Sequence, residues 1–290
     1  MVDPIGFIGL GTMGAPMARN LVKAQNKLCV FDIVPDGVNA LVEEGAIVAN
    51  SAAEVAAQCK TVVLMLPDSP HVQEVVFGDG GLASAGRDDL FVINCTTMSP
   101  RSCEEAAKAA ADQGIAWLEA PVTRGIRGAI GGTLCFLVGG SDADLERARP
   151  LLDVMGSDVY HIGNHGEAMA LKMVNNCLTV GICAMVAETI ALGRKSGLDM
   201  QKMLDILSDS SADSYSLREK LPRMIAGDFE PGFAIKHGYK DLSLALQFAA
   251  ELESSLPVVA SAREVFGMAR QQGKGEMDTS AVYQLFSTKR

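Results

Sequence analysis

The order of apolar and polar residues divides the chain into two parts of different character. In the first part, short and nearly continuous apolar runs alternate with alanine-rich amphipathic segments. Such runs are typical of strands in a parallel sheet whose two faces are covered by helices. The predicted strands are Ile5–Leu10, Leu28–Asp32, Thr61–Leu66, Phe91–Asn94, Ala116–Glu119, Thr133–Val138 and Asp158–His161. The pattern therefore predicts an α/β domain with a parallel sheet.

The second part, beyond Gly163, has a helical pattern throughout. The stretch from Gly166 to Gly197 contains no proline and has apolar residues at helical spacing, so we expect one long helix there. The further predicted helices are Met200–Leu207, Ser216–Ile225, Lys240–Leu252, Pro257–Gln271 and Thr279–Phe286. We therefore predict an α/β domain over residues 1–163 and an all-helical domain over residues 164–290.

Composition and charge narrow the class of partner. Apolar residues make up 48% of the chain and the formal net charge is -10. Nucleic-acid binding is disfavoured, because it needs a basic surface that displaces counterions. We expect no membrane span and a cytoplasmic location, because the chain begins without a basic leader and no apolar run reaches about 18 residues. The seven cysteines are scattered and show no metal-binding spacing, so we interpret them as buried thiols and expect no metal site.

A glycine-rich turn follows the first predicted strand. Its residues are Gly9, Leu10, Gly11, Thr12, Met13 and Gly14, and Pro16 stands near the start of the helix that follows. In this context a GxGxxG motif is typical of dinucleotide binding, because the glycines let a pyrophosphate approach the backbone at a positive helix end. The sequence predicts a dinucleotide site here.

Asp32 ends the second predicted strand and favours NAD as the cofactor. Its carboxylate can accept hydrogen bonds from ribose hydroxyls, whereas the 2′-phosphate of NADP would meet a like charge. The alternative is that Asp32 only caps the next turn. Ligands of open α/β sheets bind at the carboxyl ends of strands. We therefore expect the loops after two further strands, with Leu66, Pro67 and Thr97, to border the cofactor.

The start of the long predicted helix carries candidate catalytic side chains. Lys172 and Asn176 are four residues apart and share one helix face, and Asn175 flanks it. Apolar neighbours would shelter the lysine from water. Desolvation lowers the pKa of a lysine, which makes the amine a more effective general acid or base near neutral pH.

Seven motifs, in order, cover nearly the whole chain: GLGTMGAPMARNL, VFD, LMLPDSP, NCTTMSP, EAPVTRGIRGAIGGTL, KMVNN and GYKDLSLAL. In this set the chain resembles the β-hydroxyacid dehydrogenases. The resemblance implies a Rossmann-type domain followed by a helical domain built on one long interdomain helix. It also implies NAD- or NADP-linked interconversion of a 3-hydroxy acid and its semialdehyde, by a homodimer or homotetramer.

The resemblance also implies roles for individual residues. Lys172 matches the catalytic lysine of the family, Asn176 its helix amide, with Asn175 beside it, and Lys240 the lysine on the cofactor side. The alternative for Lys240 is an exposed side chain that pairs with Asp241. The substrate loop corresponds to Val122, Thr123, Arg124 and Gly125. In these roles Lys172 exchanges a proton with the substrate oxygen, and Asn176 orients the lysine and the substrate.

The sequence departs from the family pattern at this substrate loop. Where many members have Ser-Gly-Gly, this chain has Thr123, Arg124 and Gly125. A guanidinium presents a planar fork of donors to an oxyanion. It resembles the arginine that sulfolactaldehyde reductases use for a sulfonate, although the surrounding residues differ. The alternative is an Arg124 that points to solvent or pairs with an acid.

The leading hypothesis is therefore an NAD-dependent oxidoreductase of a short anionic substrate, with 3-sulfolactaldehyde preferred. Hydroxyisobutyrate, tartronate semialdehyde and succinic semialdehyde are the alternatives within the family. A non-catalytic NAD-sensing module is the alternative of another class, and the Lys172 and Asn176 pair argues against it. The lysine also argues against imine reduction.

Overall fold

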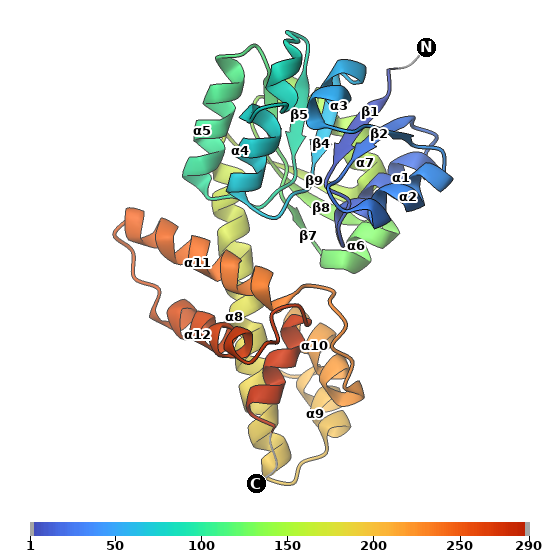
Figure 1. The fold of residues 1–290 in the computed structure, drawn as a ribbon. Helices are drawn as coiled ribbons and strands as arrows, with labels where there is room; N and C mark the ends of the chain where they lie inside the picture. Colours follow the sequence, from blue (N-terminus) through green and yellow to red (C-terminus); the bar gives the residue numbers. More distant parts are fainter. Residues whose placement is uncertain (1–2, 288–290) are drawn as a thin grey trace. The chain divides into compact units, whose positions relative to one another are not determined.

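The structure of the protein is a computed structural model, which describes residues 3–287 (Figure 1). Its contacts divide the chain into two compact units, one ending at Lys172 and one starting at Met173. The sequence places the division near residue 163, before the long helix. The division by contacts falls inside that helix because its first turn packs into the core of the first unit through Met169.

One sheet forms the framework of the first unit, and it has nine strands within residues 3–287. Their order is β3-β2-β1-β4-β5-β6-β8-β7, with β9 paired to β8. Strands β1 to β6 run parallel, as predicted, whereas β8 runs antiparallel to β6 and β7. The strands are β1 (Ile5–Ile8), β2 (Leu28–Phe31), β3 (Ile47–Val48), β4 (Thr61–Leu64), β5 (Phe91–Asn94), β6 (Ala116–Glu119), β7 (Val122–Thr123), β8 (Leu134–Gly139) and β9 (Gly156–Gly163).

Helices cover both faces of this sheet. Successive strand residues point to opposite sides, and the apolar residues on each side are buried against a different set of helices. Phe7 and Ile93 face a core shared with α1, α2 and α7, and Ile8 and Val92 face a core shared with α3, α4 and α5. The helices of the unit are α1 (Gly14–Lys23), α2 (Pro35–Glu43), α3 (Ala52–Gln58), α4 (Ser69–Phe77), η1 (Leu82–Ala85), α5 (Pro100–Ala111), α6 (Gly125–Gly131) and α7 (Asp142–Met155).

Strands β3 and β7 are absent from the sequence prediction. Each has only two residues, whereas the sequence prediction of strands rests on apolar runs of four residues or more. The antiparallel direction of β8 was also not predicted. It follows from the short connection through β7 and α6, which returns the chain beside β7 and β6 without a full crossover.

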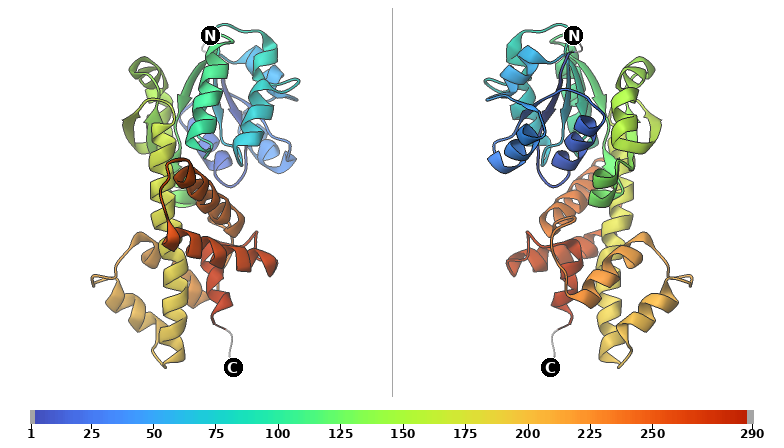
Figure 2. Two further views of the ribbon diagram at one scale, coloured as in Figure 1. Left: turned by 90° about the vertical axis from the view of Figure 1, so that its left-hand side faces the viewer. Right: turned by 90° about the vertical axis from the view of Figure 1, so that its right-hand side faces the viewer.

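The second unit is helical, as predicted. It contains α8 from Met173 on (α8 spans Glu167–Lys195), α9 (Met200–Leu207), α10 (Tyr215–Ala226), α11 (Ile235–Glu251), α12 (Pro257–Gln271) and the 3₁₀ helix η2 (Thr279–Leu285). Helices α9 and α10 lie on one side of α8, and α11 and α12 lie on the other (Figure 2). The core between them includes Val180 and Ile190 of α8, Leu221 of α10, and Phe266 of α12.

Helix α8 is long and apolar enough, by length and composition alone, to cross a membrane. Within the structure, 44% of its most apolar window is buried. A core helix of a water-soluble protein passes the same test, so this property is weak evidence for a membrane span.

The seven cysteines are all free thiols. Six are buried, as the sequence predicted, and Cys177 is half-buried. Burial raises the pKa of Cys95 to about 12 and that of Cys183 to about 11. Because the thiolate is the reactive form, these two thiols are chemically inert at neutral pH.

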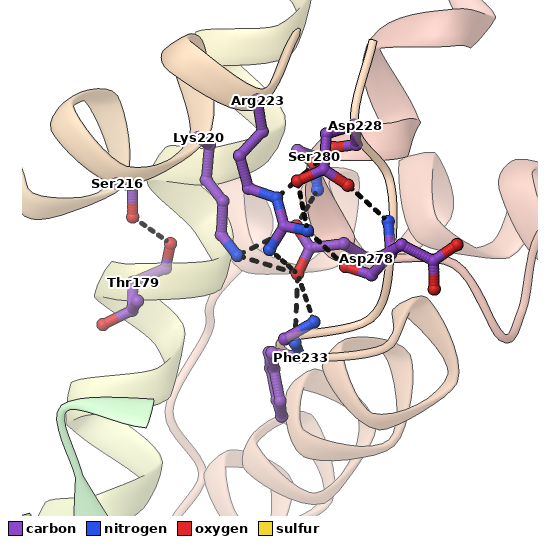
Figure 3. A network of polar contacts seen from close by, with 10 residues as sticks. Thr179, Ser216, Lys220, Arg223, Asp228, Phe233, Asp278 and Ser280 are labelled. Carbon is purple, nitrogen blue, oxygen red and sulfur yellow. Dashed lines mark hydrogen bonds and ion pairs between the residues drawn. The ribbon is translucent and has the colours of Figure 1, made fainter. Parts of the chain in front are cut away.

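A buried carboxylate, that of Asp278, binds groups from several segments of the helical unit (Figure 3). Asp278 is fully buried and lies 3.0 Å from Nζ of Lys220 and 3.5 Å from Nη1 of Arg223. It also accepts hydrogen bonds from the backbone N–H groups of Ser280, Gly232 and Phe233. Burial by itself would raise the pKa of Asp278, but Lys220 and these N–H groups together hold it below its usual value.

We predict that Asp278→Asn destabilises the protein by about 3 kcal/mol at neutral pH, because it removes the buried charge with which two partly buried cations, Lys220 and Arg223, pair. The pKa of Asp278 is lower in the folded state than in the unfolded state, so its contribution is present above the usual carboxyl pKa and disappears as the pH falls through the folded value. The difference between variant and wild type should therefore shrink below about pH 4. Urea denaturation between pH 7 and pH 3 measures both effects.

The matched control is Asp213→Asn, which removes an exposed ion pair with Arg218. Surface pairs contribute little, so this variant should keep the wild-type urea midpoint. An Asp278→Asn curve that coincides with that of wild type at neutral pH would contradict the prediction.

Candidate active site

The glycine-rich turn after β1 is shaped by two different requirements. Gly9 has a φ of +94°, and a Cβ there would lie 2.2 Å from the carbonyl oxygen of Met65. A Cβ on Gly14 would lie 1.8 Å from the carbonyl oxygen of Gly9. Both glycines are therefore required by the fold itself. At Gly11, by contrast, a Cβ would have no atom of the described residues within 4 Å apart from its two chain neighbours, so packing does not explain this glycine.

An open backbone at Gly11 fits a pyrophosphate that approaches the turn. Leu10, Thr12 and Met13 complete the turn, and α1 begins at Gly14 with N–H groups directed toward it. The residues present thus fit a dinucleotide at the place where the sequence predicts one. They would hold its phosphates through backbone N–H groups rather than through side chains.

Asp32, directly after β2, is tied to this turn. Its Oδ2 accepts a hydrogen bond from the N–H of Leu10 at 2.5 Å, and its Oδ1 accepts one from Val34 at 2.8 Å. Asp32 therefore caps its turn, which is the structural alternative raised by the sequence. A carboxylate offers about four acceptor positions, so the two roles are compatible. The apolar residues that follow, Ile33 and Val34, are exposed.

A buried polar network shapes the loops after β4 and β5. The N–H of Leu66 donates to Oγ1 of Thr96 at 2.9 Å, and the N–H of Thr96 donates to Oδ1 of Asn94 at 3.1 Å. Asn94 and Thr96 are fully buried. Sequence reasoning did not assign them this role. Pro67 and Thr97 follow at the same edge of the sheet, because β4 and β5 are adjacent and parallel.

The strand order places these segments together. Strands β2, β1, β4 and β5 are neighbours, so their carboxyl ends form one edge that carries Asp32, the glycine-rich turn, Leu66 and Thr97. The chain crosses from one side of β1 to the other between β2 and β4. Such a change of direction is where open α/β sheets bind their ligands.

Lys172 is buried, with 8% of its surface exposed. It lies in α8, and its Nζ donates a hydrogen bond of 2.7 Å to the carbonyl oxygen of Val122. Val122 and Thr123 form β7, so the amine is fixed beside the predicted substrate loop. Within residues 3–172, Lys172 and Glu119 are the only buried residues among the Asp, Glu, Lys and Arg side chains.

Asn176 lies one turn further along α8 and is also buried. Its Nδ2 donates to Oδ2 of Asp241 at 2.6 Å, and Nδ2 of Asn175 donates to its Oδ1 at 2.9 Å. Nζ of Lys240 lies 3.1 Å from Oδ1 of Asp241. Asp241 thus orients Asn176 and binds Lys240. Sequence reasoning treated Asp241 only as a possible partner of Lys240; its position directly after that lysine was the available signal.

Arg124 pairs with an acid. Its Nη1 donates to Oδ2 of Asp158 at 2.6 Å, to Oγ of Ser157 at 2.7 Å and to the carbonyl oxygen of Thr133 at 3.2 Å. The guanidinium is 43% exposed. The structure therefore has the alternative arrangement, and the guanidinium is not set aside for an oxyanion of the substrate.

The backbone at Arg124 adopts an unusual conformation. Its φ of +79° lies in the left-handed region, and Gly125 follows with a φ of +59°. For a residue with a side chain this conformation costs about 1 kcal/mol, whereas glycine adopts it freely.

No group of three His, Cys, Asp or Glu side chains that could hold a metal ion occurs in the described part of the chain.

Two family models match the chain. One, the NAD binding domain of 6-phosphogluconate dehydrogenase, matches residues 4–163. The other, the NAD-binding domain of NADP-dependent 3-hydroxyisobutyrate dehydrogenase, matches residues 166–286. The chain belongs to the β-hydroxyacid dehydrogenase family. It is an oxidoreductase that acts on a CH–OH group and binds NAD, as the resemblance in the sequence implies.

Relatives within the family differ in their substrates. The chain is 40% identical to 2-(hydroxymethyl)glutarate dehydrogenase of Eubacterium barkeri, covering 97% of this chain and 94% of the relative. It is 38% identical to 3-hydroxyisobutyrate dehydrogenase of Pseudomonas aeruginosa, with 98% and 99% covered. It is 34% identical to 3-sulfolactaldehyde reductase of Escherichia coli, with 96% and 94% covered.

A solved structure has the same fold over nearly the whole length. It is a 3-hydroxyisobutyrate dehydrogenase from Salmonella typhimurium, 30% identical, with a TM-score of 0.90 and with 97% of this chain and 99% of that chain covered. The Rossmann-type domain and the helical domain predicted from the sequence are therefore confirmed.

We predict that Gly11→Ala leaves the melting temperature unchanged but weakens NAD binding roughly tenfold or more, a loss of about 1.4 kcal/mol. The reason is that the added methyl group meets no described atom of the protein and lies where a pyrophosphate would approach the backbone. Calorimetric titration with NAD and a thermal melt measure the two quantities.

The matched control is Gly14→Ala, whose methyl group would overlap the carbonyl oxygen of Gly9. This variant should lose stability even without NAD. A Gly11→Ala protein that binds NAD as tightly as wild type would contradict the assignment of the turn.

Proposed function

We propose that this enzyme interconverts a 2-substituted 3-hydroxypropanoate and its semialdehyde, with Lys172 as the proton carrier. The observation that carries the proposal is the buried amine of Lys172, held on the carbonyl oxygen of Val122 at the substrate loop. A buried ammonium group is costly unless it serves a purpose that the fold specifically supports. Proton exchange with a substrate hydroxyl is such a purpose.

The choice of substrate class rests on the relatives and on charge. Two relatives are named for their action on 3-hydroxyisobutyrate and 2-(hydroxymethyl)glutarate. In both compounds a CH₂OH group is bonded to the carbon that carries a carboxylate. This protein has a net charge of -10 and repels anions at long range, so an anionic substrate needs local positive charge. In its protonated form, Lys172 supplies such a charge beside Thr123.

Two residues of the chain, Lys172 and Asn176, would have distinct roles in the reaction. During oxidation Lys172, as the neutral amine, takes the proton of the substrate hydroxyl; in the reverse direction its ammonium returns a proton to the same oxygen. Asn176, whose amide is fixed by Asp241, would orient the substrate oxygen next to the amine. Bound NAD supplies hydride acceptance and donation at its nicotinamide ring.

The sulfonate hypothesis loses its main support, because it depends on Arg124. With Asp158 already bound to its guanidinium, Arg124 would have to exchange one anion for another to hold a sulfonate. We infer instead that Arg124 links the substrate loop to β9 and that a carboxylate is the preferred anion.

The cytoplasmic location and the homodimer or homotetramer remain predictions.

The preference for NAD over NADP is also part of the proposal. It is supported by the position of Asp32 at the edge that holds the glycine-rich turn, and by the exposed apolar side chains of Ile33 and Val34, which cannot bind a phosphate. The ratio of kcat/KM for NAD to that for NADP should therefore exceed about ten. Equal values would contradict this preference.

We predict that Lys172→Ala lowers kcat by at least a hundredfold, the usual size of a general acid–base contribution, while the dissociation constant of NAD stays unchanged. Stopped-flow measurement of NADH formation and titration with NAD test the two parts. Full turnover by the variant would refute the role of Lys172.

A substrate panel tests the choice of anion. In wild type we expect 3-hydroxyisobutyrate, 2-(hydroxymethyl)glutarate and L-glycerate to give higher kcat/KM than 2,3-dihydroxypropane-1-sulfonate. Arg124→Gly should leave the ratio of carboxylate to sulfonate activity within about threefold of wild type, because glycine adopts the same backbone conformation without strain. Dominant sulfonate activity that Arg124→Gly abolishes would support the sulfonate hypothesis instead.

A further inference from the structure

Glu119 is a fully buried carboxylate that the proposed reaction does not use. It is the last residue of β6 and lies in the core of the first unit. Burial raises the pKa of Glu119, while hydrogen bonds from Cys103, Gly166 and Ala168 oppose that rise. A buried acid costs stability unless its oxygens are satisfied, so the groups that satisfy it indicate what it does.

The donors that satisfy Glu119 come from the start of the helix that carries Lys172. Oε2 accepts a hydrogen bond from the N–H of Gly166, and Oε1 accepts one from the N–H of Ala168, both at 3.0 Å. The thiol of Cys103 donates to Oε2 at 2.5 Å. The first N–H groups of a helix lack partners within it and carry partial positive charge. Glu119 therefore caps α8 from a distant strand.

The strand next to β6 makes room for this cap. Gly139 of β8 lies directly opposite Glu119 in the antiparallel pair, and a Cβ on Gly139 would lie 2.1 Å from Oε1 of Glu119. The carboxylate thus fills the space that a side chain at residue 139 would occupy. This arrangement fixes the position of the carboxylate along the strand.

The same chain segment also supplies the acceptor for Lys172. Val122 follows Glu119 by three residues, and its carbonyl oxygen receives the amine of Lys172. Lys172 follows Ala168 by four residues, one helical turn. Residues 119–122 therefore hold residues 166–172 at two points: the carboxylate at the start of the helix and the carbonyl oxygen one turn later.

We propose that Glu119 is a positioning residue for Lys172. The carboxylate of Glu119 fixes the first turn of α8, so that the amine of Lys172 stays at the substrate loop. The inference rests on the proposed role of Lys172 as proton carrier. Glutamine at residue 119 would present an NH₂ group to one of two N–H donors, so it cannot hold both Gly166 and Ala168. The helix start, and with it the amine, would then shift.

The test is Glu119→Gln in the full-length enzyme with the best substrate of the panel. We expect kcat to fall at least tenfold while the dissociation constant of NAD stays within twofold. Glu119→Asp keeps the charge but is one methylene group too short to reach both N–H groups, so its kcat should also fall, by roughly threefold to tenfold. If Glu119→Gln does not fold, Glu119→Asp alone decides, and an unchanged kcat in that variant overturns the proposal.

A double variant separates positioning from general loss of structure. In the Lys172→Ala background, Glu119→Gln should leave the residual rate within twofold, because there is no amine left to position. A further large loss in that background would mean that Glu119 acts by another route and would overturn the proposal. Asp278→Asn is the matched control, a buried carboxylate of the helical unit that also binds backbone N–H groups; it should lower stability without lowering kcat.

The outcomes distinguish this inference from the function on which it rests. If Lys172→Ala retains full turnover, the proposed function fails. If Lys172→Ala is inactive and Glu119→Gln has wild-type kcat, only the positioning role of Glu119 fails.

Discussion

The structure depends on one buried hydrogen bond, from the amine of Lys172 to the carbonyl oxygen of Val122. An ammonium removed from water needs acceptors of fixed geometry, and a backbone carbonyl at a strand end is more rigid than most side chains. The bond therefore constrains both the helix that carries the amine and the strand that carries the carbonyl. It connects the sheet of the first unit to the residue that we assign to proton transfer.

Few other Asp, Glu, Lys or Arg side chains are buried among the described residues. The buried carboxylates Glu119, Asp241 and Asp278 each bind backbone or amide N–H groups, and Asp241 and Asp278 also bind lysine. Each carboxylate sits where two or more segments must keep a fixed relation within one unit. Arg124 shows the opposite arrangement, an exposed guanidinium that pairs with Asp158 and belongs to a residue with a left-handed backbone conformation. That difference is why we assign Arg124 to loop structure rather than to anion binding.

The sequence predicts those features that arise from local patterns. The strands next to the glycine-rich turn and the helices Met200–Leu207 and Pro257–Gln271 have clear periodicity and turn residues at their ends, and the structure has them. Helix α11 begins at Ile235, five residues before its predicted start at Lys240. Its N-cap, Ala234, has no capping side chain; the N–H groups of Ile235 and Lys236 instead donate to the carbonyl oxygens of Met277 and Gly275. Such long-range caps leave no local signal, and the same is true of Glu119 at α8 and of Asp158 at Arg124.

The central claim is that the amine of Lys172 lies at the reacting oxygen. A crystal structure of the enzyme with NAD and a substrate tests it most directly. The account predicts that Nζ of Lys172 lies about 2.6–3.2 Å from the hydroxyl oxygen of the substrate, with the carbonyl oxygen of Val122 still within hydrogen-bond distance. A substrate hydroxyl that contacts another side chain or only water, with Lys172 out of reach, would contradict it.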